Sequence, residues 1–379
     1  MNSIFVVMAI AALLASVVPS VSGSPLDDGP GRWTVEKANA WQKHHGWLVG
    51  CNFAPAYSIN ELEMWQPDTF NLEAIDHELG LAQSLGFNSV RVFLHDLLWE
   101  QDSKGLLHRM DLFLAAADRR HIGVMFVLFD SCWDPFPVPG KQREPKPHVH
   151  NSGWVQAPGQ LILKDPSKYP ALKPYVVGLL SHFRHDRRIH CWDLFNEPDN
   201  STGNSYSKVE IPDKAERALD LIKLTWRWSR EVNPDQPLTA GIWYGEWDSD
   251  TKLNAMQRFC LENSDVITFH DYGKAEDLER HIGQLKRFNR PVLCTEYMAR
   301  PQGSTFSPNL AMMKREHVGA YNWGFVSGKT QTIYPWDSWT TEYTAEPPLW
   351  FHDIFRTDGT PYRSEEVEYI RQVTGAGKR

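Results

Sequence analysis

Short apolar segments alternate with longer amphipathic segments along most of the chain. Eight short segments are rich in apolar and β-branched residues: 47–53, 89–93, 124–129, 189–195, 238–244, 266–270, 291–295 and 320–325. Most are almost continuously apolar, a pattern that predicts parallel strands covered on both faces.

The segments between these runs repeat apolar residues at helical spacing. Residues 71–85 do so and stop at Gly86, and residues 110–120 and 214–231 behave likewise. Strand–helix alternation repeated eight times predicts an α/β fold, a single-domain (β/α)8 TIM barrel. A doubly wound sheet is the alternative, but no G-x-G-x-x-G motif follows the first predicted strand.

The predicted barrel occupies residues 46–363, after a lead-in at 24–45 and before a last helix and tail at 364–379. No linker separates a second domain. Two connections are long, 130–171 after the third strand and 329–348 after the eighth. Both leave the carboxyl end of a strand, which is the active-site face of such a barrel.

The first residues are typical of a signal peptide. An apolar run at 4–18 precedes small and polar residues, so we expect cleavage near Gly23 and a signal at 1–23. The run is too short to span a bilayer comfortably. We therefore expect a secreted or periplasmic protein, without a membrane partner once the signal is removed. An uncleaved anchor is the alternative, because no Lys or Arg precedes the run.

Charge and composition narrow the range of partners. The net charge of −8 argues against a nucleic-acid binder, which usually carries a basic face. An uncharged polymer is compatible with that charge. The 16 tryptophans exceed what core packing usually requires, and the apolar faces of sugar rings stack on indole. We therefore expect an oligo- or polysaccharide substrate, and a monomer by default.

The cysteines and histidines do not predict a metal or a cofactor. The five cysteines fit no zinc or redox spacing: Cys51, Cys132, Cys191, Cys260 and Cys294. We expect buried thiols; a disulfide is the alternative in an exported protein, although an odd count leaves one thiol free. His148 and His150 are too isolated for a zinc site, and no calcium loop or phosphate-cradling glycine loop is present.

Two glutamates follow predicted strands at the carboxyl face of the barrel. Glu197 follows the fourth run in Asn-Glu-Pro, and Glu296 follows the seventh in Thr-Glu-Tyr. Strands four and seven face each other across a barrel. Glycoside hydrolysis uses two carboxyl groups that flank one bond. The sequence supplies such a pair and leaves its separation open.

At these motifs the chain resembles the clan A glycoside hydrolases, among which family 5, the cellulase and mannanase family, fits best. Three further features agree: Arg91 in Val-Arg-Val-Phe, His270 and Tyr272 in His-Asp-Tyr, and Trp323 at the end of the eighth run. The resemblance covers about residues 46–355. One tripeptide alone is a weak signal, whereas these features together at the right strand ends are a strong one.

The resemblance implies a retaining hydrolase of a β-linked glycan or glycoside of glucan, mannan or xylan type. Glu197 would be the acid/base, with its pKa raised by burial or by the neighbouring carboxylate. Glu296 would be the nucleophile, held ionised by Arg91 and Tyr272. A barrel-mouth ion pair is the structural alternative for Arg91.

The same resemblance implies contacts to the sugar. Asn196 would bind the 2-hydroxyl group, a contact that strengthens in the transition state. Trp323 would form the floor under the sugar at the cleavage point, and His270 would orient the acid/base or bind substrate. Core packing is the alternative for both rings.

Other residues at the same face are candidates for binding or support. They are His95, Asp130, Trp243, Glu246, Lys329, Trp336 and Trp339. Glu246 is the main rival as a catalytic carboxylate. Lys329 would grip sugar hydroxyls at one end of a cleft. The tryptophans would stack on sugars, or would instead pin the long loops.

The resemblance leaves the substrate and the mode of action open. Residues 324–332 resemble the barrel domains of family 2 enzymes such as β-mannosidases. The loops after strands three and eight would either close an exo-type pocket or wall a long endo cleft. A transglycosylase with the same residues is an alternative. So is a non-catalytic carbohydrate-binding barrel, although that predicts loss of a carboxylate and both are present.

Overall fold

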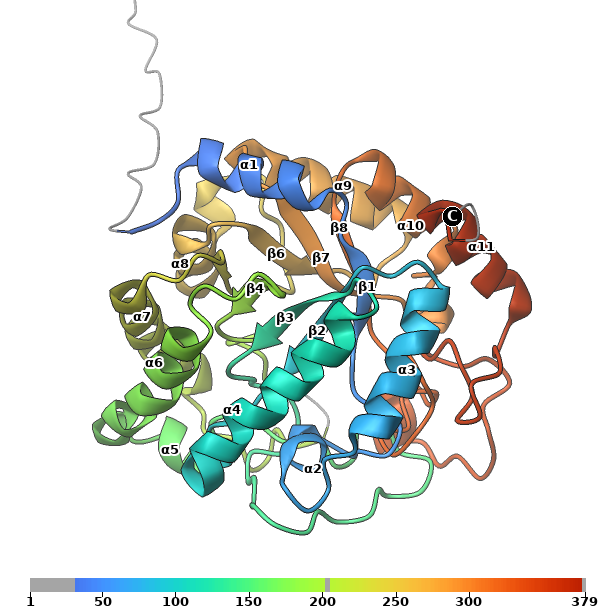
Figure 1. Ribbon diagram of the computed structural model, residues 1–379, viewed down its shortest axis with the longest axis horizontal. Coiled ribbons are helices and arrows are strands. Elements are labelled where there is room, and N and C mark those ends of the chain that lie inside the picture. Colours follow the sequence, from blue (N-terminus) through green and yellow to red (C-terminus); the bar gives the residue numbers. More distant parts are fainter. Residues whose placement is uncertain (1–30, 202–204, 377–379) are drawn as a thin grey trace, which may run out of the picture.

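A computed structural model describes residues 31–201 and 205–376 (Figure 1). Its eight parallel strands form one sheet in the order β5-β4-β3-β2-β1-β8-β7-β6. A parallel bridge between Ile242, just beyond β5, and Phe269 of β6 joins the two edges of that sheet. The predicted (β/α)8 barrel is therefore confirmed.

Every strand overlaps one of the eight predicted apolar runs. The strands are β1 (Val49–Asn52), β2 (Ser89–Phe93), β3 (Gly123–Val127), β4 (Ile189–Asp193), β5 (Leu238–Thr239), β6 (Ile267–His270), β7 (Val292–Tyr297) and β8 (Gly319–Asn322). Only β5 is much shorter than predicted, because its pairing with β4 extends over only two of its residues.

Helices surround the strands in Figure 1. They are α1 (Val35–His45), α2 (Glu61–Trp65), α3 (Leu72–Ser84), α4 (Asp96–Asp118), α5 (Gln160–Leu163), α6 (Lys173–His182), α7 (Lys214–Val232), α8 (Ala255–Asn263), α9 (Ala275–Leu285), α10 (Phe306–Arg315) and α11 (Ser364–Thr374). The predicted helices at 71–85 and 214–231 correspond to α3 and α7. In contrast, α4 begins at Asp96, well before the predicted start at residue 110. The prediction missed this first part because a kink at Asp102 interrupts the amphipathic pattern of the helix.

Polar side chains define where several helices begin. The Asn60 side chain accepts a hydrogen bond from the backbone N–H of Glu63 at the start of α2, and Asn71 does the same for α3. Such capping satisfies backbone donors that the first helical turn leaves free.

Alternate residues along the strands pack on opposite sides of the barrel wall. Val124, Phe126 and Trp192 belong to the large apolar core shared with the helices. The intervening Met125 and Cys191 belong to a separate small cluster. Because strand side chains alternate in direction, this second cluster fills the barrel interior.

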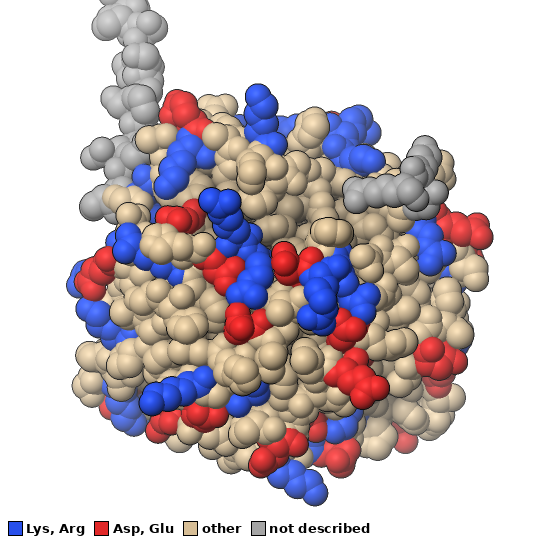
Figure 2. Space-filling model, viewed as in Figure 1, with Lys and Arg blue, Asp and Glu red and all other residues tan. Residues whose placement is uncertain are grey.

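All five cysteines are buried and free, as expected for thiols that pack as small apolar side chains. The predicted signal at 1–23 lies outside the described residues and stays a prediction. Within the described part of the chain, no helix is long and apolar enough to cross a membrane. On the face in Figure 2, basic and acidic side chains are interspersed and form no single basic patch.

Candidate active site

A cavity of about 690 Å³ opens at the carboxyl end of the barrel. It is lined by residues at or beyond the carboxyl ends of strands β3 to β8, as the barrel fold predicts. Nine of the predicted site residues lie in its wall: Asp130, Asn196, Glu197, Trp243, His270, Tyr272, Glu296, Trp323 and Trp336. Arg91 lies beneath it, fully buried.

Glu296, on β7, accepts hydrogen bonds from two donors that favour its charged form. Arg91 Nη1 lies 3.0 Å from Oε1, and the Tyr272 hydroxyl group donates to Oε2 at 2.8 Å. Burial raises the pKa of Glu296, while Arg91 and Tyr272 oppose that rise. The two donors also fix the carboxylate in one orientation.

Arg91 is itself held by polar partners on neighbouring strands. Its guanidinium forms an ion pair with Asp193 Oδ2 at 2.7 Å. It also donates to Asn52 Oδ1 at 2.8 Å and to Asn196 Oδ1 at 2.6 Å. A fully buried guanidinium requires such compensation, because desolvation of a charge is costly.

Asp130 continues this network to the wall of the cavity. Its Oδ1 accepts from Asn196 Nδ2 at 2.9 Å and its Oδ2 from Trp154 Nε1 at 2.8 Å. Arg91 and Asp130 therefore hold Asn196 from both ends of its amide group.

Glu197 has different neighbours from Glu296. His270 Nδ1 lies 2.6 Å from Oε1, Asn200 Nδ2 donates to Oε2 at 2.5 Å, and Cys132 Sγ lies 3.3 Å from Oε2. Burial raises the pKa of Glu197, and the charge of Asp199 adds to the rise. Because its direct partners carry no fixed positive charge, Glu197 is better suited than Glu296 to hold a proton.

The backbone of Glu197 adopts a left-handed conformation, with φ of 42°. This region is uncommon for residues other than glycine and costs free energy that the surrounding structure must offset. The hydrogen bonds from Asn200 and His270 fix the side chain in that geometry.

His270, on β6, lies between the two glutamates. Its Nδ1 is 2.6 Å from Glu197 Oε1 and 3.6 Å from Glu296 Oε2. Burial lowers the pKa of His270 to about 4, so the ring is neutral at pH 7. Neutral His270 can donate a hydrogen bond from Nδ1 to ionised Glu197, or, as the other tautomer, accept one at Nδ1 from the acid form of Glu197.

One side-chain atom from each of Glu197, His270 and Glu296 lies within 4.8 Å of the other two. On distance alone these groups could hold a metal ion. The Arg91 guanidinium already supplies positive charge to Glu296, however, and His270 already pairs with Glu197. The expectation of a metal-free and cofactor-free site stays a prediction.

The structure corrects the roles predicted for His95 and Lys329, neither of which lines the cavity. Fully buried His95 caps α4, where Nδ1 accepts from the backbone N–H of Leu97, and its Nε2 lies 3.0 Å from the Gln156 carbonyl oxygen. Lys329 Nζ pairs with Glu63 Oε1 at 2.6 Å, which ties the loop after β8 to α2. Both side chains are therefore structural.

Glu246 and Trp339 also lie outside the cavity wall. The half-exposed Glu246 turns toward α9, where hydrogen bonds from Gln284 and Arg280 lower its pKa. It is therefore an ionised surface carboxylate. Trp339 stacks on Trp133 with ring centroids 5.7 Å apart, so it pins a loop.

Sequence reasoning missed Asn200 and the role of Cys132 as partners of Glu197. Asn200 lies three residues after Glu197, and that spacing within a tight turn was an available signal. Cys132 lies on a long loop whose path the sequence pattern does not determine.

The amino-acid sequence matches no protein-family model and no curated protein. Solved structures nevertheless match most of the chain. A family 5 enzyme (GH5_18) from Streptomyces cattleya, solved with GlcNAc, has a TM-score of 0.58 at 15% identity, over 88% of this chain and 80% of its own. The chain shares its fold with β-mannanases. One of them, the endo-β-1,4-mannanase of Thermotoga petrophila, has a TM-score of 0.54 at 16% identity. The match covers 88% of this chain and 77% of the mannanase chain.

A third structure, the exo-β-1,4-mannosidase Op5Man5 of Opitutaceae bacterium strain TAV5, has a TM-score of 0.58 at 20% identity, over 87% of this chain and 60% of its own. The predicted resemblance to clan A and family 5 is thus confirmed at the level of the fold. The likeness of residues 324–332 to family 2 stays a prediction.

Proposed function

We propose that this protein is a retaining β-glycoside hydrolase with β-mannosides as its leading substrates. The observation that carries the proposal is the pair of buried glutamates at the mouth of the barrel. One carboxyl oxygen of Glu197 and one of Glu296 lie within 4.8 Å of each other. Retaining enzymes hold their carboxyl groups roughly 5 Å apart, whereas inverting enzymes need roughly 6.5–9.5 Å to admit a water molecule.

The unlike surroundings of the two glutamates support a division of roles. Glu197, in its acid form, donates its proton to the glycosidic oxygen as the bond to the anomeric carbon breaks. Ionised Glu296 attacks that carbon and forms a covalent glycosyl-enzyme. Glu197 then removes a proton from water, whose oxygen displaces Glu296 and releases the sugar with its original anomeric configuration.

Neutral His270 supports both halves of this cycle. Its Nδ1 lies 2.6 Å from Glu197 Oε1. It can accept a hydrogen bond while Glu197 is protonated and donate one while Glu197 is ionised, provided that the ring changes tautomer. A neutral ring also avoids fixing Glu197 in its charged form.

The structural neighbours favour mannosides over glucans and xylans. Their names include β-1,4-mannanases, an exo-β-1,4-mannosidase and a complex with Manβ1-4GlcNAc. The identities are 20% or less, so glucan and xylan belong in the same test. Transglycosylation by the same residues would give longer products rather than free sugar.

The decisive experiment is a hydrolysis screen on β-mannan, β-glucan, xylan and aryl β-glycosides. Glu197→Gln and Glu296→Gln should each reduce kcat by several orders of magnitude, while Glu246→Gln, a matched variant outside the cavity, should retain activity. NMR should detect the β-anomer first. Activity that survives Glu296→Gln, or an α-anomer formed first, would contradict the proposal.

We also propose that the protein is exported after removal of residues 1–23. The apolar run at 4–18 and the small residues that follow support this. Mass spectrometry of the protein from its native host should give a chain that begins at Ser24. A full-length chain retained in the membrane fraction would contradict it.

A further inference from the structure

The cavity is open at one end and closed at the other. From this asymmetry we infer that the enzyme removes sugar from the non-reducing end of its substrate and does not cut inside a chain. The inference rests on the proposed function, because the two glutamates must mark the point of cleavage. It concerns which end of a glycan chain can extend beyond that point.

The glutamates determine the direction of the substrate. Glu197 protonates the leaving oxygen, so the leaving group must extend past Glu197 and away from Glu296. Asn200 contacts Glu197 directly, and Trp243 Nε1 donates to the adjacent Asp199 at 2.9 Å. The end of the cavity beside Asn200 and Trp243 therefore receives the leaving group, and the opposite end receives the non-reducing part.

The end for the leaving group is open to solvent. Tyr244 lines it and is 44% exposed, and its ring packs edge-on against Trp243 at 4.7 Å. Asp277, which also lines this end, has a half-exposed carboxylate. Among the described residues, which stop at Ser201 and resume at Ser205, the exposed Tyr244 and the half-exposed Asp277 face solvent here, so a glycan can extend past them with an aromatic surface for its first sugar.

The opposite end is a wall of buried side chains. Trp154, His150 and Asn151 line it and are only 2%, 1% and 1% exposed. Trp154 packs edge-on against Trp323 at 5.7 Å and against Phe93 of β2 at 5.2 Å. Its indole N–H is fixed by Asp130, so this side chain is held in place by both polar and apolar contacts.

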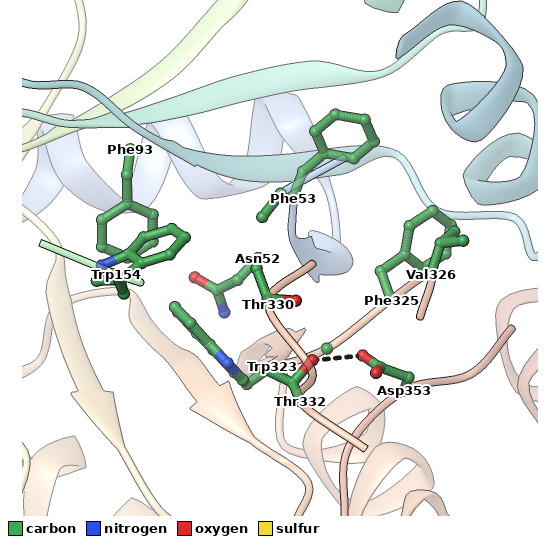
Figure 3. A pocket seen from close by; sticks show the side chains of 12 residues that line it. Asn52, Phe53, Phe93, Trp154, Trp323, Phe325, Val326, Thr330, Thr332 and Asp353 are labelled. Atoms are coloured by element: carbon green, nitrogen blue, oxygen red, sulfur yellow. Dashed lines mark hydrogen bonds between the residues drawn. The ribbon is translucent and has the colours of Figure 1, made fainter. Parts of the chain in front are cut away.

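A second, much smaller cavity lies behind the part of this wall that Trp154 and Trp323 form. Figure 3 shows Trp154 and Trp323 beside Asn52 and Phe93 around that cavity, whose volume is about 20 Å³. A volume of this size holds about one water molecule. The two indoles thus separate the main cavity from a space that cannot admit a sugar.

The loops after β3 and β8 lock the wall in place. The backbone N–H of Asn151 donates to the carbonyl oxygen of Thr330 at 2.8 Å, and Trp339 Nε1 donates to the carbonyl oxygen of His150 at 2.8 Å. Trp133 stacks on Trp339 nearly face to face. These contacts join two loops distant in sequence across the side of the barrel where a longer non-reducing chain would have to pass.

The test uses β-1,4-linked hexasaccharides of mannose, glucose and xylose, each labelled at the reducing end with 2-aminobenzamide. Exo action predicts a ladder of labelled products that shorten stepwise from the non-reducing end. A 4,6-benzylidene cap on the non-reducing sugar of the mannose and glucose substrates should slow cleavage about 100-fold, because the closed end cannot admit it. Early labelled products of random length, or equal cleavage of capped and free chains, would overturn the inference.

Trp133→Ala tests the loop contacts that hold the wall, because the Trp133 ring packs against His150 with ring centroids 5.4 Å apart. Removing this indole should raise the ratio of internal to terminal cleavage about tenfold. Trp41→Ala, on α1, removes an indole that packs against the apolar cluster inside the barrel instead and should leave the ratio unchanged. An unchanged ratio in Trp133→Ala would overturn the assignment of the closed end to these loops.

The two proposals fail in different ways. If the enzyme cleaves glycan chains internally and loses this activity in Glu296→Gln, the proposal of a retaining hydrolase stands and only the inference of exo action is overturned. Cleavage of an aryl β-glycoside but of none of the three hexasaccharides would retain the hydrolase and overturn exo action on glycan chains, whereas inactivity on the hexasaccharides and on every substrate of the screen would overturn both.

Discussion

At the scale of single residues, Glu197 and Glu296 are equally buried but have different hydrogen-bond partners. Both are almost completely buried, so desolvation favours the acid form of each. Of the two glutamates, only Glu296 forms hydrogen bonds with the Arg91 guanidinium and the Tyr272 hydroxyl group. The buried cation therefore opposes the acid form of Glu296 by direct contact, whereas Glu197 lacks such a contact.

Arg91→Met should reduce both activity and stability. Loss of the guanidinium leaves Asp193 buried without its ion-pair partner, a change that costs about 3–5 kcal/mol in the free energy of unfolding. Denaturation in guanidinium chloride would measure that loss. Arg280→Met, which breaks exposed pairs with Glu246 and Asp277, should cost only about 0–1 kcal/mol. Equal effects of the two substitutions would contradict this account of Arg91.

Cys132→Ala should move the basic limb of the pH profile of kcat/KM to higher pH. The hydrogen bond from Cys132 opposes the burial that raises the pKa of Glu197. Without the thiol this pKa rises further, and Glu197 keeps its proton at higher pH. Cys260→Ala, a buried cysteine on α8, is the control. A basic limb that stays in place or moves to lower pH would show that the thiol does not act on Glu197.

Residues on the strands could be predicted from the sequence, whereas residues beyond the strand ends could be predicted only in part: Glu197 and Tyr272 line the cavity. A strand determines the position of its last side chains, and this is why Glu296 and His270 were found. His95 and Glu246 follow their strands in the sequence, where alternation no longer determines side-chain direction. Each turned toward a helix instead of the cavity.

At the scale of elements, close approach of β1 and β2 depends on Gly50. A Cβ at this position would lie 1.6 Å from the carbonyl oxygen of Ser89, a backbone atom that cannot move without disrupting the barrel. Gly50→Ala should therefore lower the free energy of unfolding by more than about 4 kcal/mol, or prevent folding.

Gly283→Ala is the matched control, because a Cβ there meets nothing within 4 Å. In the interior of α9 it should stabilise the protein by roughly 0.4–1 kcal/mol. Thermal unfolding would compare the two variants. A Gly50→Ala protein as stable as wild type would contradict the close approach of the strands.

The elements that the sequence predicted best were those with uniform patterns. Parallel strands covered on both faces appear in the sequence as continuous apolar runs, so all eight strands could be located. The first part of α4 was missed, since the kink at Asp102 interrupts its spacing. The contacts between the loops after β3 and β8 were left open, because local pattern carries no information about a partner far away in the chain.

At the scale of the whole molecule, stability should depend on the buried carboxyl group of Glu78 in α3. Its Oε1 accepts from the backbone N–H of Ala56, and burial raises the pKa of Glu78 to about 7. The unfolded chain loses this proton near pH 4.5. The stabilisation is therefore fully present below pH 4.5 and is lost as pH rises to about 7, by about 1.4 kcal/mol per pH unit.

Glu78→Gln should remove this dependence, because the amide can accept the same hydrogen bond without ionising. Unfolding in guanidinium chloride at pH 5 and pH 8 would measure the pH dependence of the free energy of unfolding. Glu73→Gln, on the exposed side of the same helix, is the control. The difference between wild type and Glu78→Gln isolates this group from buried histidines, which destabilise the protein as pH falls. A difference that does not change with pH would contradict the assignment.

The bridge between Ile242 and Phe269, which joins β5 to β6, has a consequence for how the protein responds to heat. Hydrogen exchange measures local opening, and a thinly bonded seam should open at a lower free energy than the rest of the sheet. His270 follows Phe269 on that edge, and its backbone N–H donates to Ile242. Local opening of this junction between β5 and β6 would move His270 away from Glu197 while the other strands stay paired. On warming, catalysis should therefore fade before circular dichroism reports unfolding.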